Sequence, residues 1–183
     1  MIIIGIDEVG RGSLVGPVVA CACLLDDLSP KIPDVRDSKL ISKSKIYKLA
    51  KTLAGQYKYG IGIASVQEID EINILEATKL AIKRAEENLK PHNAEKILID
   101  GNINHEDSRF ESIPKGDNLI YAISCASIIA KEYRDRLMRE LALEYSIYGW
   151  EKNAGYGSKA HIEAIKLHGI SPHHRKKFIS KIV

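Results

Sequence analysis

The sequence lacks the features that direct a chain into a membrane or out of the cell. Its apolar runs are far shorter than the roughly 20 residues that a membrane-spanning helix needs. The N-terminus has neither the basic segment nor the small-residue cleavage site of a secretory signal peptide. With only three cysteines, at least one has no disulfide partner in the chain, and their apolar neighbours predict buried thiols. These absences favour a cytoplasmic protein without membrane contact.

Motifs for nucleotide loops and serine hydrolases are missing as well. The stretch GRGSLVG at 10–16 does not have the GxxxxGK[ST] pattern of a phosphate-binding loop. It also differs from GxGxxG, because Gly16 comes one position late and a strand, not a helix, is expected to follow. No serine lies in a GxSxG elbow. A nucleotide cofactor and an acyl-transfer triad are therefore disfavoured.

A strong excess of either charge is also absent. The chain has 27 basic and 24 acidic residues, so its net charge is only +3. Binding to nucleic acid would therefore require basic residues to gather locally. The densest basic cluster is HHRKK at 173–177, where His174 and Arg175 are candidate contacts to a nucleic-acid backbone. With 183 residues, 45% of them hydrophobic, the chain is long enough for one domain over 1–183 with a substantial core.

The hydrophobic pattern predicts an α/β protein. Apolar runs bounded by turn residues predict strands over 2–8, 17–25, 57–65 and 96–100. Helical periodicity predicts helices over 44–53, 66–89, 118–145 and 159–168, with Leu75, Ile82, Ala85 and Leu89 sharing one face of the second. The polar stretch 103–114 is expected to be irregular. Strands followed by strand–helix alternation imply a sheet with helices packed on it and a helical C-terminal portion from about residue 146.

Acidic residues end two of the predicted strands. Asp7 and Glu8 follow the apolar run 2–6, and Asp100 ends the run KILID. If these strands are parallel neighbours, Asp7 and Asp100 lie side by side, and carboxylate oxygens suit Mg²⁺ or Mn²⁺. Asp7 and Glu8 would point to opposite faces of a regular strand, so a joint role requires a bend at Glu8. The alternatives are a solvent-facing Glu8 and a turn-forming Asp100.

The residues alone offer more than one candidate for a fourth acid. Asp117 precedes a predicted helix, so its alternative role is that of an N-cap. Asp107 competes with it but lies in the polar stretch expected to be irregular. Asp135 belongs to the charged face of a helix. Besides the acids, Gly10, Arg11 and Gly12 form a tight loop whose backbone can approach a phosphate or a sugar hydroxyl, unless the loop is only a hairpin turn.

Seven segments in order resemble the ribonuclease HII (type 2 ribonuclease H) family. They are DEVGRGSLVGP at 7–17, DSK at 37–39, IDGN at 99–102, KGD at 115–117, ASIIAKEYRDR at 126–136, GYGSKAH at 155–161 and SPHHR at 171–175. The resemblance spans nearly the whole chain. It implies a ribonuclease H-like fold, with a mixed central sheet flanked by helices. The chain departs from the family's usual pattern at three places. Leu40 stands where a lysine is common, Asn153–Ala154 where a His-Lys pair is common, and Ser158 where threonine is common.

The resemblance also implies the site residues. It favours Asp117 as the fourth acid and makes Asp7, Glu8, Asp100 and Asp117 the catalytic metal ligands. Gly10, Arg11 and Gly12 would act with Tyr156 to sense the junction between a ribonucleotide and the following deoxyribonucleotide. Further expected substrate contacts are Ser38, Lys39, Lys131, Arg134 and Ser158.

The implied activity is that of a metal-dependent endoribonuclease using Mn²⁺ or Mg²⁺. Two ions about 3.5–4 Å apart would serve phosphodiester hydrolysis. The enzyme would cleave the RNA strand of RNA–DNA hybrids and incise 5′ to single ribonucleotides in duplex DNA, leaving 3′-hydroxyl and 5′-phosphate ends. A monomer is expected. The alternatives are a Mg²⁺-dependent phosphotransferase acting on a small metabolite and a non-catalytic module that binds hybrids.

Overall fold

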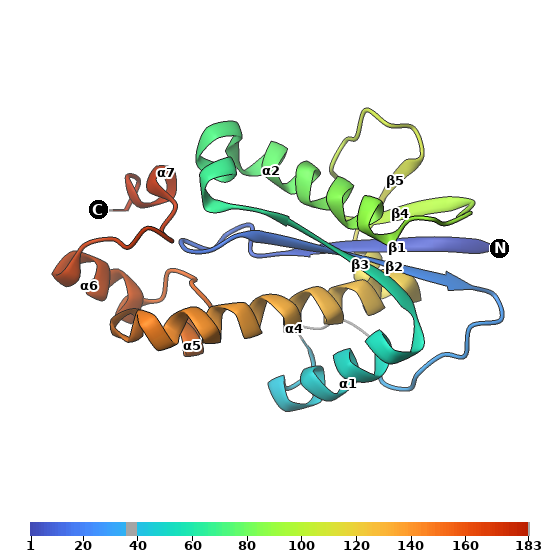
Figure 1. The fold of residues 1–183 in the computed structure, drawn as a ribbon, viewed down its shortest axis with the longest axis horizontal. Coiled ribbons are helices and arrows are strands. Elements are labelled where there is room, and N and C mark those ends of the chain that lie inside the picture. The colour runs from blue at the N-terminus through green and yellow to red at the C-terminus, as the bar shows by residue number, and fades with distance from the viewer. Residues whose placement is uncertain (36–39, 183) are drawn as a thin grey trace.

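A five-stranded mixed sheet forms the centre of the protein. The structure is a computed structural model that describes residues 1–35 and 40–182 (Figure 1). The strands are β1 (Ile2–Val9), β2 (Val18–Asp26), β3 (Lys58–Ala64), β4 (Lys96–Asp100) and β5 (Phe110–Ile113), in the spatial order β3-β2-β1-β4-β5. β2 pairs antiparallel with β1 and β3, whereas β4 pairs parallel with β1 and β5. The predicted mixed sheet is therefore confirmed.

Helices cover both faces of this sheet. α2 (Val66–Leu89) lies on one face, and α1 (Lys43–Gln56) and α4 (Tyr121–Glu144) lie on the other (Figure 1). Gly5 lets α4 approach β1, because a Cβ atom there would lie 2.2 Å from the carbonyl carbon of Ala122. The three cysteines are buried free thiols, as expected. No helix in the described part of the chain has the length and apolar character that a bilayer-spanning segment requires.

Three local predictions were wrong. β5 lies inside the stretch expected to be irregular, because a short, half-buried edge strand such as FESI carries little hydrophobic signal. Leu75 is 42% exposed. Asn73 interrupts α2 with φ of 73°, and its side chain accepts hydrogen bonds from the N–H groups of Leu75 and Glu76, so a new helical segment begins there and Leu75 lies in its first turn. The helix expected over 118–145 is divided at Ile120, where the backbone is extended.

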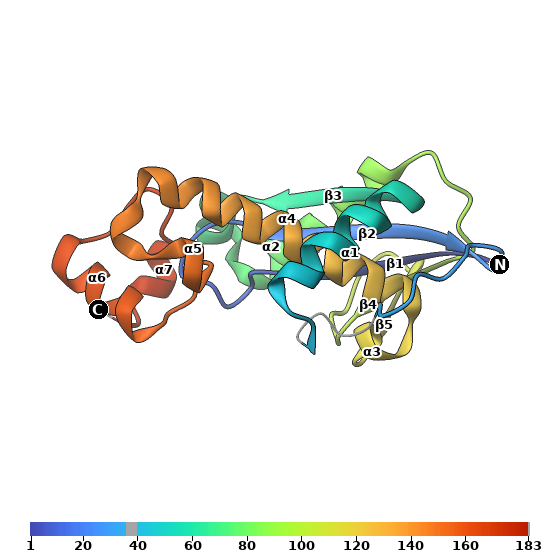
Figure 2. The ribbon, with the colours of Figure 1, turned by 90° about the horizontal axis from the view of Figure 1, so that it is seen from below.

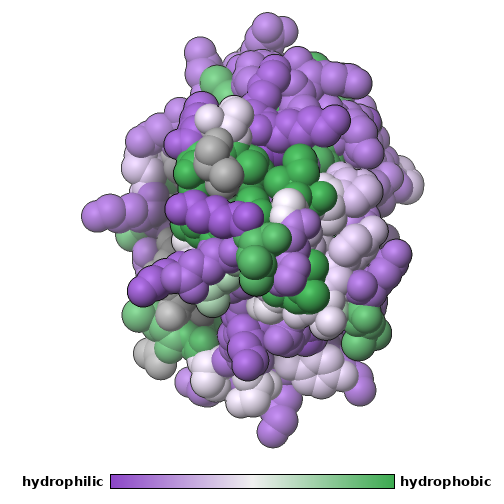
Figure 3. All heavy atoms as spheres, turned by 90° about the vertical axis from the view of Figure 1, so that its left-hand side faces the viewer, coloured by the Kyte–Doolittle hydropathy of each residue, from purple (hydrophilic) through white to green (hydrophobic). Residues whose placement is uncertain are grey.

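The C-terminal portion packs beyond the end of the sheet, against the last turns of α4 (Figure 2). It comprises the 3₁₀ turn η2 (Ser146–Tyr148) and the helices α5 (Trp150–Asn153), α6 (Lys159–His168) and α7 (Lys176–Ile179). Its core joins the Gly-rich loop to these helices through Leu14, Val15, Met138, Trp150 and Ile165. In Figure 3, hydrophilic side chains surround a smaller apolar area on this end of the molecule. The short helix α3 (Gly116–Leu119) lies near the opposite end.

Candidate active site

The two strands that carry the acids, β1 and β4, are parallel neighbours, so their carboxyl ends lie side by side at one end of the sheet. The parallel pairing of β1 and β4 ends at Ile6 and Ile99, one residue before Asp7 and Asp100. Beyond this point β1 continues to pair with β2 as far as Val9, while its other side is open. The opening is a cavity of about 350 Å³, lined by Asp7, Glu8, Val9, Gly10, Arg11, Gly12, Asp100, Ser127, Lys131 and Tyr156.

Asp7 and Glu8 line this cavity together although the pairing of β1 with β2 stays regular. Glu8 faces Ala20 in the ladder and Val9 faces Val19, so the bend expected at Glu8 does not interrupt the register. β4 has already ended, and this leaves room for both acids on the open side of β1. The N–H of Glu8 donates to Oδ1 of Asp7 at 2.8 Å.

Burial of these acids penalises their ionised forms. It raises the pKa of Asp7 well above its ordinary value, and the charges of Glu8 and Asp100 raise that pKa further, against a hydrogen bond from Ser127. Burial also raises the pKa of Glu8. Arg11 opposes this effect, with its Nη1 atom 3.5 Å from Oε1 of Glu8. A cation in the cavity would relieve both acids.

The donor set fits a divalent cation. Oε2 of Glu8 is buried and has no hydrogen-bond partner among residues 1–35 and 40–182, and a buried carboxylate oxygen without a donor is costly unless an ion binds it. Among the described residues, no group of three or more His, Cys, Asp or Glu side chains is by itself arranged to hold a metal ion. Mutual repulsion separates carboxylates when no cation lies between them, and catalytic metal sites also use water and substrate oxygens.

Asp117 is beside Asp100 but does not line the cavity. It is 4% exposed, and its N–H donates to Oδ1 of Asp100 at 3.2 Å. Lys115, with φ of 57°, is the N-cap of α3, so Asp117 lies in the first turn instead of capping it. Asn118 donates its side-chain amide to Oδ1 of Asp117 at 3.1 Å. The structure thus groups this acid with Asp100.

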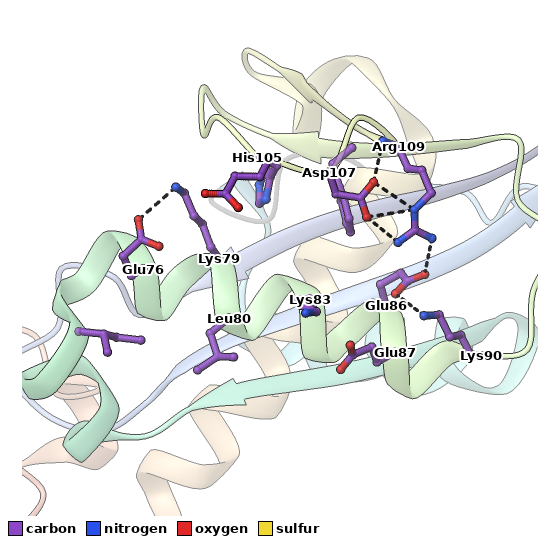
Figure 4. A pocket seen from close by; sticks show the side chains of 13 residues that line it. Glu76, Lys79, Leu80, Lys83, Glu86, Glu87, Lys90, His105, Asp107 and Arg109 are labelled. Atoms are coloured by element: carbon purple, nitrogen blue, oxygen red, sulfur yellow. Dashed lines mark hydrogen bonds and ion pairs between the residues drawn. The ribbon is translucent and has the colours of Figure 1, made fainter.

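The competing acids belong to other surroundings. Asp107 lines a separate cleft of about 610 Å³ between α2 and the loop before β5 (Figure 4). It accepts hydrogen bonds from Arg109, which lower its pKa to about 2. Ion pairs line the same cleft: Lys79 pairs with Glu76 within α2 at 3.1 Å, and Arg109 pairs with Glu86 across the cleft at 3.3 Å. These charges largely compensate one another, so this cleft does not resemble a metal site. Asp135 pairs with Lys131 at 3.2 Å.

The Gly-rich loop forms the wall opposite the acids. Gly10 has φ of 93°, and a Cβ atom there would lie 2.2 Å from Nε of Arg134. Only glycine fits this position without a shift. A Cβ atom on Gly12 would lie 4.0 Å from the ring of Tyr156, so the loop and this tyrosine are in contact range. The guanidinium of Arg134 is 5.7 Å from the centroid of the same ring.

Arg134 and Arg175 hold this wall from inside, and both are 0% exposed. Arg134 donates to the carbonyl oxygens of Pro17, Ala154 and Val15 at 3.0, 2.8 and 2.7 Å. Arg175 donates to those of Gly16, Arg11 and Gly10 at 2.9, 2.9 and 2.6 Å. Arg134 was expected to contact substrate, and the structure instead buries it against the backbone.

The basic cluster at 173–177 differs from expectation in the same way. His174 and Arg175 are buried, whereas Lys176 and Lys177 are exposed. A run of basic letters does not reveal which side chains find acceptors inside the protein. The buried histidine and arginine therefore cannot form the expected surface patch.

The remaining predicted contacts are less uniform. Arg11 is 43% exposed at the mouth of the cavity, and Lys131 lines it. Ser158 does not line it, because its side chain caps α6 by accepting the N–H of His161 at 3.3 Å. Ser38 and Lys39 lie outside the described residues. Ser127 was not predicted, although it lies one helical turn before Lys131 and that spacing could have indicated a shared face.

Comparisons with known proteins give one consistent result. A family model described as ribonuclease HII matches residues 4–181. Ribonuclease HII of Orientia tsutsugamushi (strain Ikeda) is 54% identical over 97% of this chain and 85% of that protein. Ribonuclease HII of Rickettsia prowazekii (strain Madrid E) is 52% identical over 98% and 92%. The crystal structure of ribonuclease H2 from Pyrococcus horikoshii OT3 superposes with a TM-score of 0.79 at 28% identity, covering 100% of this chain and 97% of that one.

Proposed function

Because this chain belongs to the ribonuclease HII family, we propose that its reaction takes place in the cavity between the acids and the Gly-rich loop. The protein is an endonuclease that hydrolyses the RNA strand of RNA–DNA hybrids. It also incises duplex DNA on the 5′ side of an embedded ribonucleotide, leaving 3′-hydroxyl and 5′-phosphate ends. Enzymes of this family depend on divalent metal ions.

We assign the metal-binding role to Asp7, Glu8, Asp100 and Asp117. The observation that carries this assignment is the buried Oε2 of Glu8, which has no partner in the described part of the chain, next to an Asp7 whose pKa is raised by burial and by its acidic neighbours. Mn²⁺ or Mg²⁺ bound here would activate a water molecule and stabilise the leaving oxygen. Asp7 and Glu8 line the cavity directly, while Asp117 supports Asp100 through its N–H.

We assign recognition of the junction between a ribonucleotide and the following deoxyribonucleotide to the loop of Gly10, Arg11 and Gly12 and to Tyr156. Arg175 occupies the carbonyl oxygens of Gly10 and Arg11. Among the described residues, no acceptor bonds the N–H groups of Arg11 and Gly12, which therefore remain available to a ligand. A 2′-hydroxyl can accept such a bond, and the exposed guanidinium of Arg11 suits a phosphate. The ring of Tyr156 offers a surface against the sugar next to it.

Two further proposals concern Lys131 and the state in which the protein works. We propose that Lys131 contributes a phosphate contact, since it lines the cavity and its partner Asp135 holds it in place. We also propose that the protein acts as a monomer and that it works in the cytoplasm, where thiols such as its three free cysteines stay reduced.

The deciding experiment uses a labelled DNA duplex that contains one ribonucleotide, with Mn²⁺ or Mg²⁺, beside an all-DNA duplex. The expected result is a single cut 5′ to the ribonucleotide, which Asp7→Asn slows by about 10³-fold. Asp107→Asn is the matched control, because this acid lies in the separate cleft and its loss should leave cleavage unchanged. Full activity of Asp7→Asn, or its loss in Asp107→Asn, would contradict the proposed location of the site.

A further inference from the structure

The segment from Ser171 to Arg175 contacts both substrate-reading elements from behind. Arg175 donates to the carbonyl oxygens of Gly10 and Arg11 at 2.6 and 2.9 Å. The side chain of His174 lies 3.3 Å from that of His161, nitrogen to nitrogen. His161 in turn lies 2.8 Å from the carbonyl oxygen of Tyr156. One short segment therefore connects the loop to the tyrosine without entering the cavity.

The hydrogen bonds fix the proton positions on both histidines. Nε1 of Trp150 can only donate, and it donates to Nε2 of His161 at 3.1 Å. The proton of His161 is consequently on Nδ1, which donates to the carbonyl oxygen of Tyr156. The N–H of Ser171 donates to Nδ1 of His174 at 2.9 Å. The proton of His174 is consequently on Nε2 and points to Nε2 of His161, whose single lone pair it shares with the N–H of Trp150. Both rings are neutral, and each ring nitrogen has a partner.

These contacts fix the backbone at Tyr156. Its carbonyl oxygen accepts from His161 and from the N–H of Ser158 at 2.9 Å, and its own N–H donates to Asn153 at 2.9 Å. The neighbouring Gly155 accepts the N–H of Leu14 from the Gly-rich loop at 2.9 Å. The ring of Tyr156 is thus held opposite Gly12 by bonds on both sides of the contact.

We propose that His161, His174 and Arg175 are positioning residues that set the spacing between Tyr156 and the Gly10–Gly12 loop, and thereby set the selectivity for a ribonucleotide junction. This inference rests on the proposed reading role of those two elements. All three residues are 0–1% exposed, so they act through the backbone they hold and do not touch substrate. Outer groups that orient a contacting group commonly change activity about 10–100-fold when removed.

The effect should concentrate on substrates with a single ribonucleotide. Asp7 and Glu8 are held in the pairing of β1 with β2, and Asp100 in that of β4 with β5, and residues 171–175 take no part in these ladders. A shift of the loop against Tyr156 would therefore leave the acids in place while it disturbs the junction contact. A long hybrid offers a ribonucleotide at every position, so it tolerates a misplaced contact better than a duplex with one.

A matched pair of substitutions at His161 tests this inference. An asparagine amide places an N–H near the position of Nδ1, whereas a glutamine amide places it near Nε2. The measured quantity is the ratio of kcat/KM on a duplex with one ribonucleotide to kcat/KM on a long hybrid. We expect His161→Gln to lower this ratio about 10-fold and His161→Asn to keep it within about 2-fold. Equal ratios in the two variants, or equal losses on both substrates, would overturn the inference.

Tyr156→Ala distinguishes failure of this inference from failure of the proposed function. If Tyr156→Ala leaves the ratio unchanged, the reading role itself is wrong. If it lowers the ratio while His161→Gln does not, only the positioning role is wrong. Should His161→Gln not fold, the pair His174→Gln and His174→Asn repeats the test at the next bond. There glutamine keeps the donor to His161 and should retain the ratio, and a loss as large as that of asparagine would count against the positioning role.

Discussion

The cavity has two walls that bury opposite charges in different ways. On the acidic wall, Asp7 and Glu8 are buried with raised pKa values, and none of the described residues bonds Oε2 of Glu8. On the opposite wall, Arg134 and Arg175 are completely buried, yet each donates to three carbonyl oxygens. Burial lowers the pKa of Arg175 to about 9, which still leaves it charged at neutral pH.

This difference indicates that the arginine wall has a structural role, whereas the acidic wall is the one that binds a partner and reacts. A buried charge is tolerated when hydrogen bonds replace its hydration, and the two arginines obtain them all from the protein. The acids do not, so part of their compensation must come from a bound partner. Substitutions on the acidic wall should therefore affect activity more than folding, while those on the arginine wall should lower the free energy of unfolding and affect activity only through the placement of the loop.

The largest effect is expected for Asp7→Asn. Loss of this carboxylate should lower kcat on a ribonucleotide-containing duplex by about 10³-fold, the range for removal of one strong transition-state interaction. The same variant should be more stable than the parent protein by about 1 kcal/mol in chelator at pH 8, because a buried charge is removed. Urea unfolding with and without Mn²⁺ measures the second effect. A destabilised variant would show that Asp7 has a structural role.

Arg175→Met should have the opposite pattern. It removes the side-chain donor to the carbonyl oxygens of Gly10, Arg11 and Gly16, which should lower the free energy of unfolding by about 3 kcal/mol. Arg136→Met is the control, since that arginine side chain is 50% exposed and its loss should cost less than about 0.5 kcal/mol. Urea denaturation at pH 7 compares the two. Equal effects would mean that the buried hydrogen bonds contribute little.

The pH dependence of stability should also differ between the two sides. Burial lowers the pKa of His174 to about 4, whereas an unfolded histidine titrates near 6.5. The unfolded chain therefore binds the proton first, and this residue should reduce stability by about 2 kcal/mol between pH 6.5 and 5. Asp7 and Glu8 have raised pKa values, so their contribution is largest in acid and is lost as pH rises through those values.

Unfolding of the metal-free protein at several pH values tests this contrast. His174→Gln should remove much of the decrease in stability below pH 6.5, and Asp7→Asn should reduce the decrease in stability at higher pH. If His174→Gln did not change the pH dependence of stability below pH 6.5, protonation of this histidine would not be what destabilises the protein.

The sequence predicts the acidic wall better than the arginine wall. Asp7 and Asp100 each end an apolar strand, and parallel neighbouring strands bring such ends together, so their proximity follows from local patterns. The partners of Arg175 are carbonyl oxygens more than 150 residues away in the chain, and no local pattern reveals them. The same reason explains why HHRKK was expected to be a surface cluster and why Arg134 was expected to contact substrate.

Substitution of Arg11 should have the smallest effect on activity. It tests the comparison most directly, because Arg11 contacts both walls. Its carbonyl oxygen accepts from Arg175, while its guanidinium is 43% exposed and faces Glu8 at 3.5 Å. Arg11→Gln keeps the backbone contact and removes only the charge. We expect KM to rise about 5–10-fold with little change in kcat, and the slope of log binding constant against log salt to fall by about one. Arg136→Gln should change neither. A salt slope that is unchanged in Arg11→Gln would remove the phosphate contact from this residue and leave it only the task of moderating the charge of Glu8.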